Sequence, residues 1–106
     1  MSTRATIAVR RADGYYDAVY LHFDGYPDQT GQTLKEYFAT QDLAEELVAG
    51  GDLRCLDRTT GKVERYSSRN ASAILPTHYA LVDFARNCGA QYLYVFDDES
   101  WTCREL

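Results

Sequence analysis

The sequence predicts an α+β fold in which an antiparallel, or mixed, sheet of about five strands carries three helices packed mainly on one face. Two alternating segments flank Asp13-Gly14 near the start of the chain, which favours a β-hairpin. Three amphipathic stretches with helix-capping residues follow. A nearly continuous apolar segment, residues 91–96, is typical of a strand covered on both faces. The expected element order is ββααβαββ, in a single domain spanning residues 1–106.

The hairpin is expected over residues 6–10 and 16–23. In the first strand Ile7 and Val9 share one face. The dipeptide Asp13-Gly14 tolerates positive φ at both central positions of a type I′ turn. The second strand alternates, with its larger aliphatic side chains and one phenylalanine on one face: Val19, Leu21 and Phe23.

The first two helices are marked by capping residues. Thr33 and Glu36 have the spacing of a capping box, which predicts a short helix over residues 31–39. Thr40 or Asp42 can cap a second helix, which a glycine pair ends. The apolar face of this second helix would consist of Leu43, Ala44, Leu47 and Val48.

The middle of the chain gives weaker signals. Residues 53–57 are ambiguous between a helical turn and a short strand. Residues 63–67 predict an edge strand, because the basic side chains around them would resist further strand pairing. The polar segment 67–76 is expected to form a loop.

The last third of the chain predicts one helix and two strands. Thr77 caps a third helix whose apolar stripe holds Leu81, Phe84, Ala85 and Cys88. The apolar strand over residues 91–96 follows. A turn at residues 97–100 then leads into a final strand, in which Trp101 and Cys103 are expected to face the packed side.

Charge is distributed unevenly along the chain, whose net charge is −5. Residues 12–53 hold nine acids against a single lysine, whereas residues 54–69 are net basic. This balance disfavours non-specific DNA binding, because affinity for phosphate comes from clustered cations. An acidic face suits a basic partner, or keeps the protein soluble.

The three cysteines, Cys55, Cys88 and Cys103, are odd in number and share no C-x-x-C spacing. A disulfide scaffold and a structural zinc site are therefore disfavoured. No apolar run approaches the roughly 18 residues of a membrane span, and no signal-peptide pattern opens the chain. We expect a reduced, cytoplasmic protein with no membrane partner.

Several segments occur together in a specific order: residues 2–5 (Ser-Thr-Arg-Ala), residues 22–27 (His-Phe-Asp-Gly-Tyr-Pro), residues 51–53, residues 89–96 and Trp101. In this order the chain resembles a family of small proteins encoded by phages, prophages and bacteria. That family has no assigned biochemical activity, so the resemblance supplies no catalytic residues. By context it implies an inhibitor of host defence, such as an anti-CRISPR protein, in the host cytoplasm.

The chain departs from this family at two points. Relatives commonly have Trp where this chain has Phe23. They also carry a His-Arg-Asp-like run after the tyrosine that matches Tyr66, where this chain has Ser-Ser-Arg at residues 67–69. No function is therefore assigned to the 67–69 segment on the basis of the resemblance.

A metal or acid–base site could use His22, Asp24 and Asp28, where the second strand ends. A simpler interpretation is architectural. Asp24 would accept backbone N–H groups in the loop, and Asp28 or Thr30 would cap the next helix. Three or four ligands are usual for a metal, and the other histidine, His78, begins a distant helix. We therefore expect no catalytic residue, metal or cofactor.

The remaining exposed features predict a binding surface. Tyrosine is enriched at interfaces, and Tyr26 in the loop is a candidate together with Asp28. The other candidates are acids: Asp42, Glu45, Glu46, Asp97, Asp98 and Glu99. The three acids of the second helix could instead form a solvated helix face near its N-terminus. We predict a non-enzymatic, phage-type protein that inhibits a host defence complex by protein–protein binding through this acidic, tyrosine-bearing surface.

Two alternatives stay open. The basic segment 62–69, with Tyr66 as a stacking platform, could serve a small nucleic-acid-binding accessory protein. Four or five cations and one aromatic ring make a small footprint, which disfavours this alternative. The chain could also be a structural or interaction module for an unknown partner, and a homodimer is compatible with its tyrosine-rich composition.

Overall fold

The structure is a computed structural model that describes residues 3–66 and 71–106. The fold is α+β, as expected, with a mixed seven-stranded sheet and three α-helices in the described residues. The strands are β1 (Ala5–Arg10), β2 (Tyr16–Leu21), β3 (Leu53–Leu56), β4 (Val63–Arg65), β5 (Ala73–Leu75), β6 (Tyr92–Asp97) and β7 (Ser100–Glu105). The helices are α1 (Gln32–Tyr37), α2 (Gln41–Ala49) and α3 (His78–Asn87), and a π-helical turn, η1 (Pro27–Gly31), precedes α1.

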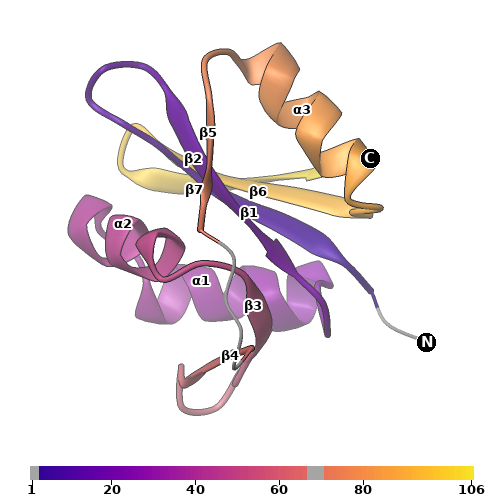
Figure 1. The fold of residues 1–106 in the computed structure, drawn as a ribbon. Helices are drawn as coiled ribbons and strands as arrows, with labels where there is room; N and C mark the ends of the chain where they lie inside the picture. The colour runs from indigo at the N-terminus through magenta and orange to yellow at the C-terminus, as the bar shows by residue number, and fades with distance from the viewer. Residues whose placement is uncertain (1–2, 67–70) are drawn as a thin grey trace.

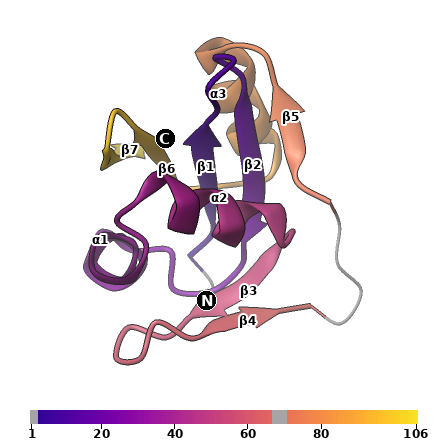
Figure 2. The ribbon, with the colours of Figure 1, turned by 90° about the vertical axis from the view of Figure 1, so that its left-hand side faces the viewer.

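The sheet has the strand order β4-β3-β2-β1-β6-β7, and β5 also pairs with β2. Strands β3 and β5 meet opposite ends of β2, as Figure 2 shows. The β1–β6 and β2–β3 pairs are parallel, and the other pairs are antiparallel. Strand β4 lies at an edge, as predicted.

The predicted strand number and order were wrong, because two segments without a clear strand pattern pair with β2. The ambiguous segment 53–57 contains β3, and the predicted loop 67–76 contains β5. Residues 67–70 of that loop lie outside the described residues. Strands of three or four residues show too little alternation to be recognised, so pairing with an existing strand decides their conformation. The order is ββααβββαββ.

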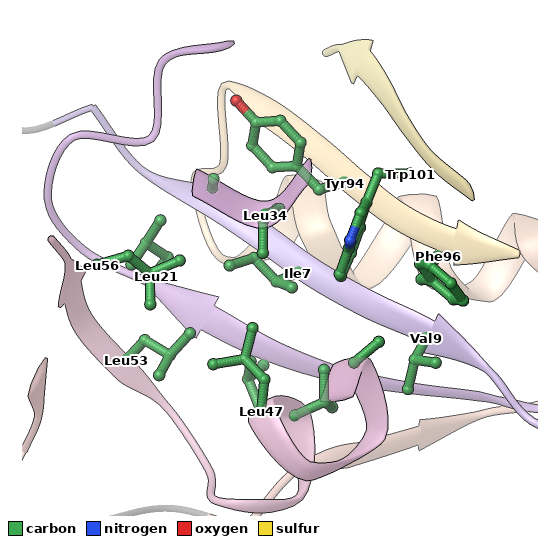
Figure 3. Close-up of a cluster of buried hydrophobic side chains, with 14 residues drawn as sticks. Ile7, Val9, Leu21, Leu34, Leu47, Leu53, Leu56, Tyr94, Phe96 and Trp101 are labelled. Carbon is green, nitrogen blue, oxygen red and sulfur yellow. The ribbon is translucent and has the colours of Figure 1, made fainter. Parts of the chain in front are cut away.

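The prediction that the helices pack mainly on one face of the sheet was also wrong. Helices α1 and α2 cover one face, and α3 covers the opposite face (Figure 1). Ile7 and Val9 belong to the buried cluster under α1 and α2, which Figure 3 shows. Ala8, between them in β1, belongs to the cluster under α3. Alternate side chains of the central strands are therefore buried on both faces.

The hairpin turn between β1 and β2 differs from the predicted type I′ turn. Only Gly14 has a positive φ there, +88°. The Gly14 N–H donates to the carbonyl oxygen of Arg11 at 3.0 Å, and the Arg11 N–H donates to that of Tyr15 at 2.7 Å. This is the pattern of a three-residue loop with a glycine bulge. The two-residue turn with positive φ at both positions joins β6 to β7 instead, at Asp98 (53°) and Glu99 (66°).

Two of the four predicted helix caps are confirmed. The Thr40 hydroxyl accepts the Leu43 N–H at 3.2 Å, and the Thr77 hydroxyl accepts the Ala80 N–H at 3.1 Å. The predicted cap by Asp28 or Thr30 was wrong, because neither η1 nor α1 has a side-chain cap hydrogen bond. The predicted capping box was wrong. Thr33 is buried inside α1 and donates its hydroxyl to the carbonyl oxygen of Gln29 at 2.8 Å. The chain is already helical from the start of η1, so Thr33 has no helix start to cap.

Arg65 of β4 has a different role from the predicted protection of a sheet edge. Its guanidinium donates to the carbonyl oxygens of Leu47 at 2.8 Å and Gly51 at 2.7 Å. These carbonyls lie at the C-terminal end of α2, where unpaired carbonyl oxygens and the helix dipole favour a cation. Arg65 therefore ties β4 to α2.

Candidate binding surfaces

The structure brings two acidic segments of the chain together at one end of the sheet. An open hollow of about 360 Å³ there is lined by residues of the β1–β2 hairpin and by Gln41, Glu45 and Asp97. The amide Nε2 of Gln41 donates to the carbonyl oxygen of Arg10 at 3.0 Å and to the Glu45 carboxylate at 2.8 Å. The start of α2 therefore lies beside the end of β1.

We call the acids gathered at this place the acidic end. Glu45 and Asp97 line the hollow, and the others are exposed on α2 or in the β6–β7 turn. All six come from the predicted binding set: Asp42, Glu45, Glu46, Asp97, Asp98 and Glu99. Leu43 is 41% exposed on the same helix, so the acidic end also offers apolar surface.

Two arginines at the acidic end are paired with carboxylates. Arg10 lies 3.2 Å from Asp97, and Arg11 lies 2.9 Å from Asp13 and 3.5 Å from Asp17. Such surface ion pairs contribute little to stability. These pairs neutralise both arginines and also Asp97, so the negative charge of the acidic end comes mainly from α2, which holds three acids and no base, and from the β6–β7 turn.

Tyr26 and Asp28 do not belong to the acidic end. The neighbouring Gly25 donates its N–H to the carbonyl oxygen of Thr3 at 2.9 Å, just before β1 begins. The acidic end lies at Arg10, where β1 ends. Gly25 also lies close to Ala5, the first residue of β1, and at about 3.3 Å per residue the five steps from Ala5 to Arg10 span about 16 Å. The predicted surface is therefore divided in two, and its tyrosine lies away from most of its acids.

The loop that carries Tyr26 is held by backbone acceptors. The Tyr94 hydroxyl donates to the carbonyl oxygen of Gly25 at 2.7 Å in the interior, and the Thr30 hydroxyl donates to that of Asp24 at 2.7 Å. Gly25 is packed so closely that a Cβ atom there would lie 2.9 Å from the Cβ of Ala5. Asp24 thus contributes its carbonyl oxygen and a positive φ of 57°. These contacts support an architectural role for the loop.

Replacing Tyr94 with phenylalanine should lower the free energy of unfolding by about 1–3 kcal/mol, because it leaves the buried Gly25 carbonyl without its donor. Burial raises the pKa of Tyr94, so the phenol keeps its proton throughout the neutral range. Urea denaturation measures the change. Tyr92→Phe, at a half-buried position of the same strand, is the matched control and should change the free energy of unfolding by less than about 0.5 kcal/mol.

A group of aromatic side chains that the sequence interpretation treated as part of a strand gathers around His22. The Tyr20 hydroxyl and His22 Nδ1 are 2.5 Å apart. The His22 ring centroid lies 4.4 Å from that of Phe23 and 6.5 Å from that of Tyr66. Burial raises the pKa of Tyr20. Tyr20 and His22 are two positions apart within the predicted strand 16–23, so a shared strand face is the sequence signal for this contact.

The described residues contain no group of three or more His, Cys, Asp or Glu side chains that could hold a metal ion. The His22 ring contacts the aromatic rings of Tyr20, Phe23 and Tyr66.

The cysteines differ from expectation in their burial. Cys103 is exposed and Cys88 is half-buried after the end of α3, whereas both were expected to face the core. Cys103 lies on the edge strand β7, whose outer side pairs with no strand of the described residues. Cys55 donates to the Glu64 carboxylate at 3.2 Å, and burial followed by this bond raises its pKa to about 11. Burial also raises the pKa of Cys88 and Cys103, so all three thiols stay protonated at neutral pH.

Comparisons with protein-family models, with curated proteins and with solved structures gave no match to this chain. Among the described residues, none of the helices has the length and apolar character needed to cross a membrane.

Proposed function

We propose that this protein is a non-enzymatic binding protein whose acidic end engages a basic region of a protein partner. The observation that supports it most is the convergence of α2 and the β6–β7 turn, about 50 residues apart in sequence, around one hollow. Complementary charge of this kind steers association and fixes the orientation of a partner.

The distribution of the acids favours a binding role over a purely solvated helix. Asp42 lies in the first turn of α2, where the helix dipole alone favours an acid. Glu46 lies a turn further on, and Asp98 and Glu99 belong to no helix. The dipole therefore accounts for one of these positions only.

For the identity of the partner we propose a host defence complex, which the resemblance to small phage-encoded proteins implies. Defence effectors that hold a nucleic acid do so in basic grooves. An acidic protein surface that occupies such a groove competes with the phosphate backbone. The protein would then act as an inhibitor, without chemistry of its own.

The acidic end can be tested with a soluble basic probe, an acetylated and amidated octalysine peptide. Replacing Asp42, Glu45 and Glu46 together with lysine should weaken binding by about tenfold or more at low salt, because the probe loses its attraction and meets repulsion. Isothermal titration calorimetry measures the affinity. The control variant Asp28→Lys, Glu64→Lys, Asp83→Lys changes the net charge equally at exposed positions elsewhere and should retain most of the binding.

Equal losses in the two triple variants would contradict a localised acidic site, because net charge alone would then explain the binding.

A single-stranded oligonucleotide is the second probe. A mobility shift with it would support the alternative in which the 62–69 segment binds nucleic acid. Tyr66→Ala tests this alternative better than Arg65→Glu, because Arg65 holds the end of α2.

A further inference from the structure

Strand β7 is the longest edge of the sheet. It has six residues, whereas β4 and β5 have three each. Its register with β6 is unbroken from Asp97↔Ser100 to Tyr92↔Glu105. Among the described residues no strand pairs with its outer side, and Figure 2 shows β7 at the border of the sheet. Long, regular edges are normally shortened, bulged or covered in monomeric proteins, because they can pair with another chain.

The backbone of β7 presents its hydrogen-bonding groups outward at alternate residues. The two-residue turn Asp98-Glu99 makes Asp97 and Ser100 a hydrogen-bonded pair. The Leu106 N–H donates to the carbonyl oxygen of Gln91 at 2.9 Å, which continues the same alternation. The backbone N–H and C=O groups of the even-numbered residues of β7 therefore pair with β6. Those of Trp101, Cys103 and Glu105 point away from the sheet.

Two adjoining hollows lie beside β7 on the face that carries α1. One, of about 240 Å³, is lined by Ala39, Phe96, Glu99 and Trp101 among others. The second, of about 90 Å³, lies next to Tyr94 and Cys103, and both hollows share Lys35 and Trp101. The Trp101 indole N–H donates to the carbonyl oxygen of Phe38 at 2.8 Å. This bond holds the indole ring in place between the two hollows. A strand added to β7 would place every second side chain over these hollows.

The charge of this edge argues against a second copy of the same chain as the occupant. Antiparallel pairing of β7 with its own copy brings Glu105 of one chain toward the Asp98-Glu99 turn of the other, and like charges facing each other across strands are destabilising. Each copy also carries a net charge of −5. A segment with a basic residue near the turn meets Asp98 and Glu99 there, whereas Lys35, which lines both hollows, favours an uncharged side chain over the hollows.

We propose that β7 is a docking edge for an extended basic segment of a protein partner, which joins the sheet as an additional strand. Main-chain hydrogen bonds to Trp101, Cys103 and Glu105 supply affinity, as in other strand-addition complexes. An apolar side chain of the segment fills the larger hollow, and a basic side chain pairs with Glu99 or Asp98. This inference rests on the proposed function, since it specifies how the basic partner binds.

The test uses two peptides of equal charge, acetyl-(Lys-Val)4-amide and acetyl-(Lys-Gly)4-amide. The first favours a strand and offers apolar side chains, and the second does neither. The valine peptide should bind at least about tenfold more tightly. Nuclear magnetic resonance should detect slowed amide exchange at Trp101, Cys103 and Glu105 on its addition. Unchanged exchange at these three amides would overturn the proposal.

Cys103→Pro removes one outward donor, and proline is tolerated at such an edge position. The variant should lose about tenfold in affinity for the valine peptide, while Cys103→Ser, which keeps the N–H, should bind like the parent protein. A valine peptide with N-methylated valines gives the same test on the unchanged protein, in case the proline variant does not fold. Binding that survives both changes would overturn strand addition.

Octalysine binding separates this proposal from the proposed function. If Cys103→Pro and N-methylation have no effect but the lysine triple variant at α2 abolishes octalysine binding, only the docking edge falls. If the changes at Cys103 and in the peptide backbone have no effect, and the lysine triple variant also binds octalysine like the parent protein, both proposals are wrong. Light scattering on the free protein measures whether the protein forms a dimer. A dimer that Cys103→Pro dissociates would assign the edge to a second copy and overturn the basic segment.

Discussion

Replacing Phe96 with alanine is expected to lower the free energy of unfolding by about 3–5 kcal/mol. The side chain is fully buried between the sheet and α1 and α2, and its ring centroid lies 5.3 Å from that of Trp101 in an edge-on arrangement. The change removes a large apolar group and leaves a cavity that the rigid sheet can close only in part. Urea denaturation followed by Trp101 fluorescence measures the loss.

Phe96→Leu is the matched control for this prediction. Leucine keeps most of the apolar volume, so the loss should be clearly smaller than that of the alanine variant. Equal losses for leucine and alanine would mean that the edge-on contact with Trp101, and not cavity formation, determines the contribution of Phe96.

Replacing Leu81 with alanine is expected to cost about 2–5 kcal/mol on the opposite face of the sheet. Leu81, a residue of α3, is fully buried against the sheet in a cluster with Ala8 and Ala18. Tyr79→Ala, on the same helix but 82% exposed, should change the free energy by less than about 0.5 kcal/mol. Calorimetric melting of both variants is the measurement.

The Leu81 result also tests whether the sheet is covered on both faces. A sheet with helices on one face only would leave α3 loosely attached, and truncation of Leu81 would then cost little. A loss below about 0.5 kcal/mol, similar to that of Tyr79→Ala, would contradict the packing of α3 onto β1 and β2.

Local signals predicted the parts of the fold that local chemistry decides. Thr40 and Thr77 were recognised as caps because a hydroxyl before an amphipathic stretch has one dominant use. Thr33 had the same pattern but lies inside a helix that had already begun at η1. Whether a capping-box sequence begins a helix therefore also depends on the conformation of the residues before it.

Long-range packing and strand pairing determine two features that local sequence patterns do not predict. Ala8 and Ala18 are small, so their alternation with larger residues looked like a strand with a single buried face. Their burial under α3 depends on a helix that begins 60 to 70 residues further along the chain. Likewise β5 is a strand because β2 offers an edge, and its three residues carry no pattern of their own.

The sequence predicted which residue types form the candidate site, but not where these residues lie relative to one another. The acids were identified from their number and sequence position. Glu45 and Asp97 line one hollow, and four other candidates lie on the same helix or in the adjoining turn. Their convergence follows from the parallel pairing of β1 and β6, which sets Arg10 beside Asp97. The same pairing sets Tyr26 and Asp28 at the opposite end of β1, and no local signal separates the two groups.

The parallel pairing of β1 with β6 also has a consequence for biosynthesis. Paired residues such as Ala5 and Tyr92 are 87 positions apart in the chain. At about 5–20 residues per second, a ribosome needs roughly 4–17 s to make that length. During this time the N-terminal hairpin has been made but its central neighbour has not, so the apolar edge of β1 stays open to solvent. The sheet can close only after translation has passed β6, and contacts of such long range fold slowly.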